Sequence, residues 1–200
     1  MKVAIIGATG FLGKSLVNEF TNRNHQVTAI SRTAQDSDKE NLQYVAVDVL
    51  NIEALAEVLK GNDAVVSAFN PGWTNPNIYA DFLAGAKAIQ EAVKRSGVKR
   101  LITIGGAGSL YINGSQLVDG PDFRADIKPG ATAAREYLDI IKEEKELDWA
   151  FFSPAIEMHQ GITTGRTGNY RLGLENPVFN EENRSILSGE DVAVVLADEV

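Results

Sequence analysis

Residues 2–13 read KVAIIGATGFLG. The apolar run Val3 to Ile6 leads into three glycines at the spacing G-x-x-G-x-x-G, and apolar residues then fall at helical spacing from Leu12 to Phe20. A short apolar run that ends at glycine is typical of a buried strand, and a period near 3.6 is typical of a helix that packs on one face. The stretch therefore predicts a strand, a tight turn and a helix.

The glycine spacing in this turn favours a dinucleotide site. One glycine turns the chain off the strand, one lets the backbone approach a pyrophosphate, and one lets helix and strand pack closely. The start of the helix adds unpaired N–H groups and the positive end of its dipole. A plain turn is the alternative. We expect cofactor contacts from the following residues of the turn: Gly7, Thr9, Gly10, Phe11, Leu12 and Gly13.

Composition and charge limit the class of protein. With 200 residues, 44% of them hydrophobic, the chain can bury a large core, and we expect one domain, 1–200, whose residues from about 154 to 200 form a small substrate-side segment. The absence of cysteine and of any run approaching about 18 apolar residues favours a cytoplasmic protein without membrane attachment. We expect a monomer or homodimer without a metal site.

The net charge of −8 arises in the second half, where residues 101–200 carry 8 basic and 17 acidic side chains. Residues 1–100, which hold the glycine turn, carry 11 and 10. Binding to a phosphate backbone needs a basic face, so nucleic acid is not an expected partner.

Strand and helix patterns alternate along the chain, which predicts an α/β protein with a single doubly wound parallel sheet, the NAD(P)-binding Rossmann fold, in strand order 3-2-1-4-5-6 with a small C-terminal addition. After the first strand, strands are expected at Gln26–Ile30, Gln43–Val47, Ala64–Ala68, Arg100–Ile104 and Asp148–Phe152. Helices are expected at Ile52–Leu59, about Asn77–Arg95, roughly Ala131–Glu146 and from near Ser188, with a long loop over 105–130 and a short hairpin or edge strand within Gly165–Leu174.

The loop after the second strand discriminates between the two nicotinamide cofactors. Ser31 and Arg32 stand where an NAD-binding chain carries an acidic residue, and a guanidinium can clamp the 2′-phosphate of NADP. This favours NADP(H) over NAD(H). Asp36 and Asp38 keep NAD possible, and Arg32 could also be an ordinary surface residue.

The turn GATGFLG resembles that of the short-chain dehydrogenase/reductase superfamily, in its extended and atypical branches. The resemblance implies that Asp48 and Val49 contact adenine and that residues 68–70 form a turn over the cofactor. A helix cap at Asp48, a role that Asn51 could also fill, and a purely structural bend at 68–70 are the alternatives. The full set of expected contacts after the third to sixth strands is Asp48, Val49, Ala68, Phe69, Asn70, Gly105 and Pro154.

Catalysis is where this sequence departs from that superfamily. Relatives that reduce carbonyls carry Tyr-x-x-x-Lys, in which the Tyr is the general acid. Here Ile141 stands four residues after Tyr137, and Lys142 lies about 140° away around the helix axis. The dyad is absent, so Tyr137 is expected to be a packing residue.

Three other side chains are candidates for catalysis. Ser109 and Tyr111 follow the fifth strand, where the superfamily places its substrate-side Ser, and His159 follows the sixth. For the first two, the alternative is a loop residue with a satisfied hydroxyl; for His159, it is a solvated side chain.

The tail of the chain narrows the resemblance. RTGNYRLG at 166–173 and ILSGEDVA at 186–193 are similar to small atypical reductases, such as biliverdin-IXβ/flavin reductase, and to NmrA-like proteins. Arg166 and Arg171 could contact an acidic substrate or pair with nearby carboxylates.

The resemblance implies an NADPH-dependent reductase of a flavin, quinone or related conjugated acceptor, with that small molecule as its partner. Alternatives are an NmrA-like redox sensor that binds NADP(H) without turnover, and a nucleotide-sugar epimerase or dehydratase. The last would need the missing dyad and a substrate domain of about 100 residues.

Overall fold

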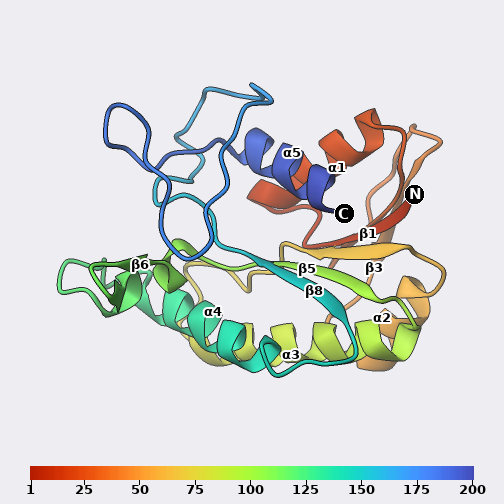
Figure 1. Ribbon diagram of the computed structural model, residues 1–200. Helices are drawn as coiled ribbons and strands as arrows, with labels where there is room; N and C mark the ends of the chain where they lie inside the picture. The colour runs from red at the N-terminus through yellow and green to blue at the C-terminus, as the bar shows by residue number, and fades with distance from the viewer.

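A parallel sheet forms the centre of the molecule (Figure 1), in a computed structural model that describes residues 1–200. Its six strands lie in the order β3-β2-β1-β4-β5-β8, and every neighbouring pair is parallel. This confirms the predicted fold class and strand order. The strands are β1 (Lys2–Ile6), β2 (Gln26–Ser31), β3 (Leu42–Ala46), β4 (Ala64–Ser67), β5 (Arg100–Ile104) and β8 (Asp148–Phe152).

Helices cover both faces of the sheet. One face carries α1 (Phe11–Asn22) and α5 (Gly189–Glu199), and the other carries α2 (Ile52–Leu59), α3 (Ile78–Ser96) and α4 (Lys128–Ile141). Because side chains alternate along a strand, β1 sends Val3 and Ile5 into the core under α1 and α5, and Ala4 and Ile6 into the core on the other face. None of the helices combines the length and the apolar character that a membrane span requires.

The bounds of most predicted strands and helices agree with the structure to within one residue, but two predicted elements differ more. The last main helix before β8 covers Lys128–Ile141 instead of 131–146, because proline is allowed in its first turn and the Glu144 carboxylate binds the N–H groups of Lys145 and Glu146 just beyond its end. The predicted hairpin or edge strand within Gly165–Leu174 is wrong. That segment forms no strand, and its Thr167 and Gly168 N–H groups donate to the Asp191 side chain instead.

The expected long loop at 105–130 contains short regular elements. These are the 3-10 helices η1 (Ala107–Ser109) and η2 (Leu117–Asp119), and a hairpin of β6 (Tyr111–Ile112) and β7 (Ser115–Gln116). Asn113 and Gly114 connect the two strands with φ values of 52° and 82°. Asn-Gly is the preferred pair for such a two-residue turn, so the sequence carried a signal for this hairpin that the prediction missed.

Candidate functional site

The strands all run in one direction, so their carboxyl ends and the loops that follow them lie along one edge of the sheet. The segment between β8 and α5, blue in Figure 1, loops over this edge on the side of α1 and α5. The predicted cofactor residues lie at the carboxyl ends of strands, in the loops that follow them or in the first turn of α1, so the topology places them along that same edge.

Two of the three glycines in the turn have no room for a side chain, and the third is open to its surroundings. Gly7 has a φ of +81°, and a Cβ there would lie 2.6 Å from the Ala68 carbonyl oxygen. A Cβ on Gly13 would lie 2.0 Å from the Gly7 carbonyl oxygen, so helix and strand pack here without room for a side chain. At Gly10 the nearest obstacle is 3.2 Å away and φ is −73°. The backbone itself therefore requires glycine at positions 7 and 13, whereas Gly10 leaves room for a ligand.

The start of α1 suits an anion. Lys14 donates the first backbone bond of the helix, to the Gly10 carbonyl at 3.1 Å, so the N–H groups of Phe11, Leu12 and Gly13 precede the helical ladder. Gly10 provides no side-chain cap, and the first turn carries no acidic residue. Free N–H groups, a helix dipole and an open approach at Gly10 fit a pyrophosphate.

The loop after β2 presents a free cation. Arg32 is exposed and forms no hydrogen bond or ion pair, not even with Asp36 or Asp38. Ser31 is buried and donates its hydroxyl hydrogen to the Thr33 carbonyl at 2.6 Å, which holds the loop in shape. The Arg32 guanidinium is therefore available to a phosphate, and its contact with the 2′-phosphate of NADP stays a prediction.

Asp48 is not the cap of α2. Asn51 caps that helix by accepting the Ala54 N–H at 3.1 Å, whereas Asp48 accepts the Leu50 N–H and stays exposed. Val49 is partly buried against the core. Contact with adenine remains a prediction for this pair.

The residues after β4 are held by local packing. The Phe69 ring packs against Phe82, with ring centres 6.2 Å apart, and Asn70 accepts the Gly72 N–H at 2.7 Å in a tight turn. Ala68 presents its carbonyl to Gly7. This bend fixes the wall beside the glycine turn, and a contact with cofactor stays a prediction.

The three catalytic candidates are not joined to one another by hydrogen bonds. Ser109 is buried and donates to the Gly106 carbonyl at 2.9 Å, so its contact with Ser153 at 2.8 Å uses the Ser153 hydrogen. Tyr111 has an exposed side chain on β6. His159 is exposed and accepts the Gly161 N–H on Nδ1 at 3.0 Å. A catalytic role for any of them stays a prediction.

Tyr137 is a packing residue, as expected. It is 1% exposed, its hydroxyl donates to Gln90 at 3.3 Å, and burial raises its pKa above the ordinary value. Lys142 lies just beyond the end of the helix, where its Nζ is 3.6 Å from the Asp139 carboxylate. No lysine therefore lowers the pKa of this tyrosine.

A cavity of about 450 Å³ lies at the carboxyl end of β8. Its apolar lining includes Phe152, Pro154, Leu187 and Val195, and most of its polar lining residues lie within 169–185, a segment that also contributes apolar ones. Gly189, two residues beyond Leu187, lies against the Phe11 ring, where an added Cβ would lie 3.0 Å away, so α5 connects the cavity to the glycine turn. Of the predicted site residues, Pro154 lines it, and Ser109, Tyr111 and His159 do not.

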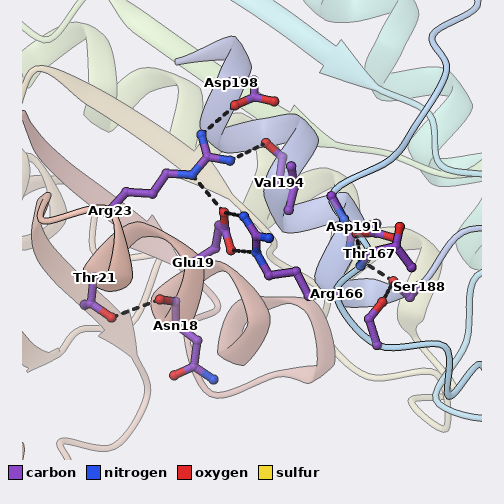
Figure 2. Close-up of polar contacts among 12 residues, drawn as sticks. Asn18, Glu19, Thr21, Arg23, Arg166, Thr167, Ser188, Asp191, Val194 and Asp198 are labelled. Carbon is purple, nitrogen blue, oxygen red and sulfur yellow. Dashed lines mark hydrogen bonds and ion pairs between the residues drawn. The ribbon is translucent and has the colours of Figure 1, made fainter.

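A polar network fixes the segment that forms this wall (Figure 2). Arg166 donates to both carboxylate oxygens of the buried Glu19, at 2.7 and 2.9 Å, and Arg23 donates to the same carboxylate at 2.8 Å. Hydrogen bonds from Arg166 and Arg23 hold the pKa of Glu19 below its ordinary value despite burial. Asp191 and Ser188 at the start of α5 bind residues 165–168 of the same segment. Of the two alternatives for Arg166, the structure therefore shows pairing with a carboxylate.

Sequence reasoning missed most of this cavity. Residues 169–187 follow no helical or strand period, so nothing local indicates which of them face inward. The arginines of RTGNYRLG were the one available signal.

A family model described as NAD(P)H-binding matches residues 7–200. The uncharacterized protein YwnB of Bacillus subtilis is 33% identical over 205 aligned positions, which cover 100% of this chain and 92% of YwnB.

Two solved structures are similar over nearly their full length. A Bacteroides thetaiotaomicron protein provisionally described as an epimerase is 41% identical, with a TM-score of 0.90 over 99% of this chain and 89% of its own. A Streptococcus pneumoniae protein provisionally described as an NADH-flavin reductase is 35% identical, with a TM-score of 0.86 over 100% and 92%.

Proposed function

Because this chain belongs to the NAD(P)H-binding family, we propose that it is a reductase that binds NADPH and passes a hydride to a small conjugated acceptor such as a flavin or a quinone. It is an oxidoreductase-like protein of that family, and the choice of cofactor and acceptor is our proposal. The acceptor is its proposed partner, with no nucleic acid or membrane involved, and we place its action in the cytoplasm as a monomer or homodimer.

The observation that carries the choice of acceptor is the state of Tyr137. A ketone or aldehyde needs a positioned acid to protonate the developing alkoxide, and this tyrosine is buried, bonded to Gln90 and without a lysine partner. When bound, NADPH supplies a hydride, and a flavin or quinone can take the matching proton from water. The side chains and backbone groups of the chain then have to bind and orient the two reactants, and none of them has to donate a proton.

Binding of the cofactor is assigned to groups that fit it. The N–H groups at the start of α1 and the open side of Gly10 suit the pyrophosphate, and the free Arg32 suits a 2′-phosphate. Arg32 supports NADPH over NADH, although the Streptococcus pneumoniae neighbour is described as an NADH-flavin reductase.

The epimerase description of the Bacteroides thetaiotaomicron neighbour gives a second candidate less support. An epimerase of the extended branch would use the Tyr-x-x-x-Lys pair, which this chain lacks. A sensor that binds NADPH without turnover shares every cofactor contact, so only a measurement separates it from the reductase.

The test is anaerobic oxidation of NADPH, followed by absorbance, with FMN, riboflavin, menadione and a simple aldehyde as acceptors. Turnover with flavin or quinone and not with aldehyde is expected. A Gly10→Ala variant serves as the control that assigns the activity to this cofactor site. Rapid reduction of the aldehyde would refute the acceptor class, and tight NADPH binding without any turnover would favour the sensor.

A further inference from the structure

Arg171 is a cation of the cavity wall without a carboxylate partner. Its Nη2 donates to the Phe179 carbonyl at 2.7 Å, and its guanidinium forms no ion pair. The other arginine of the wall, Arg184, is paired with Glu157 through both carboxylate oxygens. Only Arg171 therefore brings an unpaired positive charge to the cavity.

The charged residues that line this cavity are all basic, whereas this half of the chain is mainly acidic. No aspartate or glutamate lines the cavity, although residues 101–200 carry 17 acidic and only 8 basic side chains. In an acidic protein, a cavity lined by an unpaired arginine and by no carboxylate is a favourable site for an anion. A guanidinium with free N–H groups binds phosphate or carboxylate through charge-assisted hydrogen bonds.

Hydrogen bonds of the preceding residues and of Arg171 itself hold this side chain in position. The neighbouring Tyr170 donates its hydroxyl to Asp198 on α5 at 2.7 Å, and Arg166 anchors the start of the segment to Glu19. The bond to the Phe179 carbonyl holds the guanidinium itself. A donor already held in place loses less entropy when it binds a ligand.

The rest of the cavity suits an apolar ring. Leu110, Phe152, Leu187 and Val195 line it, and its volume of about 450 Å³ falls in the range of small-molecule sites. We propose that this cavity selects conjugated ring compounds that carry an anionic substituent, and that Arg171 binds the substituent. The role of the ring as a hydride acceptor rests on the proposed function. The binding of an anionic substituent rests on the lining of the cavity alone.

Binding of FMN and riboflavin tests the proposal, because the two share a ring and differ in a phosphate. Flavin fluorescence is titrated with protein at saturating NADP⁺, so that the FMN phosphate does not occupy the turn at Gly10. The wild-type protein is expected to bind FMN about tenfold more tightly than riboflavin, as for one charged hydrogen-bonded contact in a partly wet site. Arg171→Gln should remove this preference, and Arg171→Lys should retain part of it.

Arg124→Gln is the matched control, since Arg124 is an exposed arginine paired with Asp126 outside the cavity. It should leave both affinities unchanged. A naphthoquinone with and without a carboxylate repeats the comparison for the second kind of anion. Equal affinity for FMN and riboflavin in the wild-type protein, or an equal loss of both in Arg171→Gln, would overturn the proposal. Because binding is measured without turnover, failure of the reductase activity is seen separately in the oxidation assay.

Discussion

Replacing two glycines of the same turn by alanine should have opposite consequences for folding and for cofactor binding. In Gly13→Ala the new Cβ would lie 2.0 Å from the Gly7 carbonyl oxygen and 2.8 Å from the backbone of Ala8. All these obstacles are backbone atoms, so α1 has to move away from β1 by about 1 Å or more before the contact becomes tolerable. In Gly10→Ala the nearest obstacle is the Gly7 oxygen at 3.2 Å, a contact that a small adjustment relieves.

The expected free energies differ accordingly. Overpacking against rigid neighbours costs about 3 kcal/mol or more, and the better helix propensity of alanine returns about 1 kcal/mol, so Gly13→Ala should lower the free energy of unfolding by about 2 kcal/mol or more. Gly10 has a φ of −73°, which alanine adopts freely. The entropy that alanine removes from the unfolded chain, about 0.4–1 kcal/mol, is offset by its poorer performance as a helix cap, so Gly10→Ala should be close to neutral.

Urea unfolding of the apo protein and equilibrium titration with NADPH measure the two effects separately. Gly10→Ala should keep the wild-type unfolding midpoint and weaken NADPH binding at least tenfold, because its methyl group occupies the side from which the pyrophosphate approaches. Wild-type affinity in a folded Gly10→Ala protein would refute the placement of the pyrophosphate. A wild-type unfolding midpoint for Gly13→Ala would refute the packing argument.

The remaining predictions concern charges. Arg32→Ala should raise the Kd for NADPH far more than the Kd for NADH, and equal losses would return Arg32 to an ordinary surface residue. Since the pKa of Glu19 is held below 4.5 by Arg166 and Arg23, the ionised carboxylate stabilises the fold above that pH, and the contribution disappears as the pH falls through the lower folded value. The Tm deficit of Glu19→Gln should therefore be largest near neutral pH and shrink in acid; a deficit independent of pH would contradict the ion pairs. Arg166→Gln should speed proteolytic cleavage near residues 165–171 with NADPH affinity unchanged, and resistance equal to that of the wild-type protein would show that the other contacts of the segment suffice.

Much of the fold could be predicted because its signals are local. The strand–turn–helix at the start follows from an apolar run, three glycines and a helical period within 20 residues, and the structure places β1 and α1 there. The same kind of pattern located α2, α3 and α5, and the alternation of strands and helices predicted the sheet order. Buried parallel strands need continuous apolar runs, so they are visible in sequence.

The candidate site could be predicted only where it coincides with those strand ends. Ser31 and Arg32 were expected just after the second strand, and in the structure Ser31 is the last residue of β2 and Arg32 follows it. The role of Arg166 was left open, because its partner Glu19 lies 147 residues away in the sequence and no local pattern connects the two. The hairpin at 111–116 was missed even though its Asn-Gly turn is a local signal.

The sequence by itself determined the Rossmann architecture, the glycine turn and the absence of the Tyr-x-x-x-Lys pair, because each depends on the spacing of residues along a single element. Only the tertiary structure decided which polar side chains are paired and which are free. It joined Arg166 to Glu19, paired Arg184 with Glu157 and left Arg171 without a carboxylate beside the cavity. The physical reason is that these two ion pairs join segments far apart in the sequence, whose approach is set by packing of the whole core and not by the order of residues.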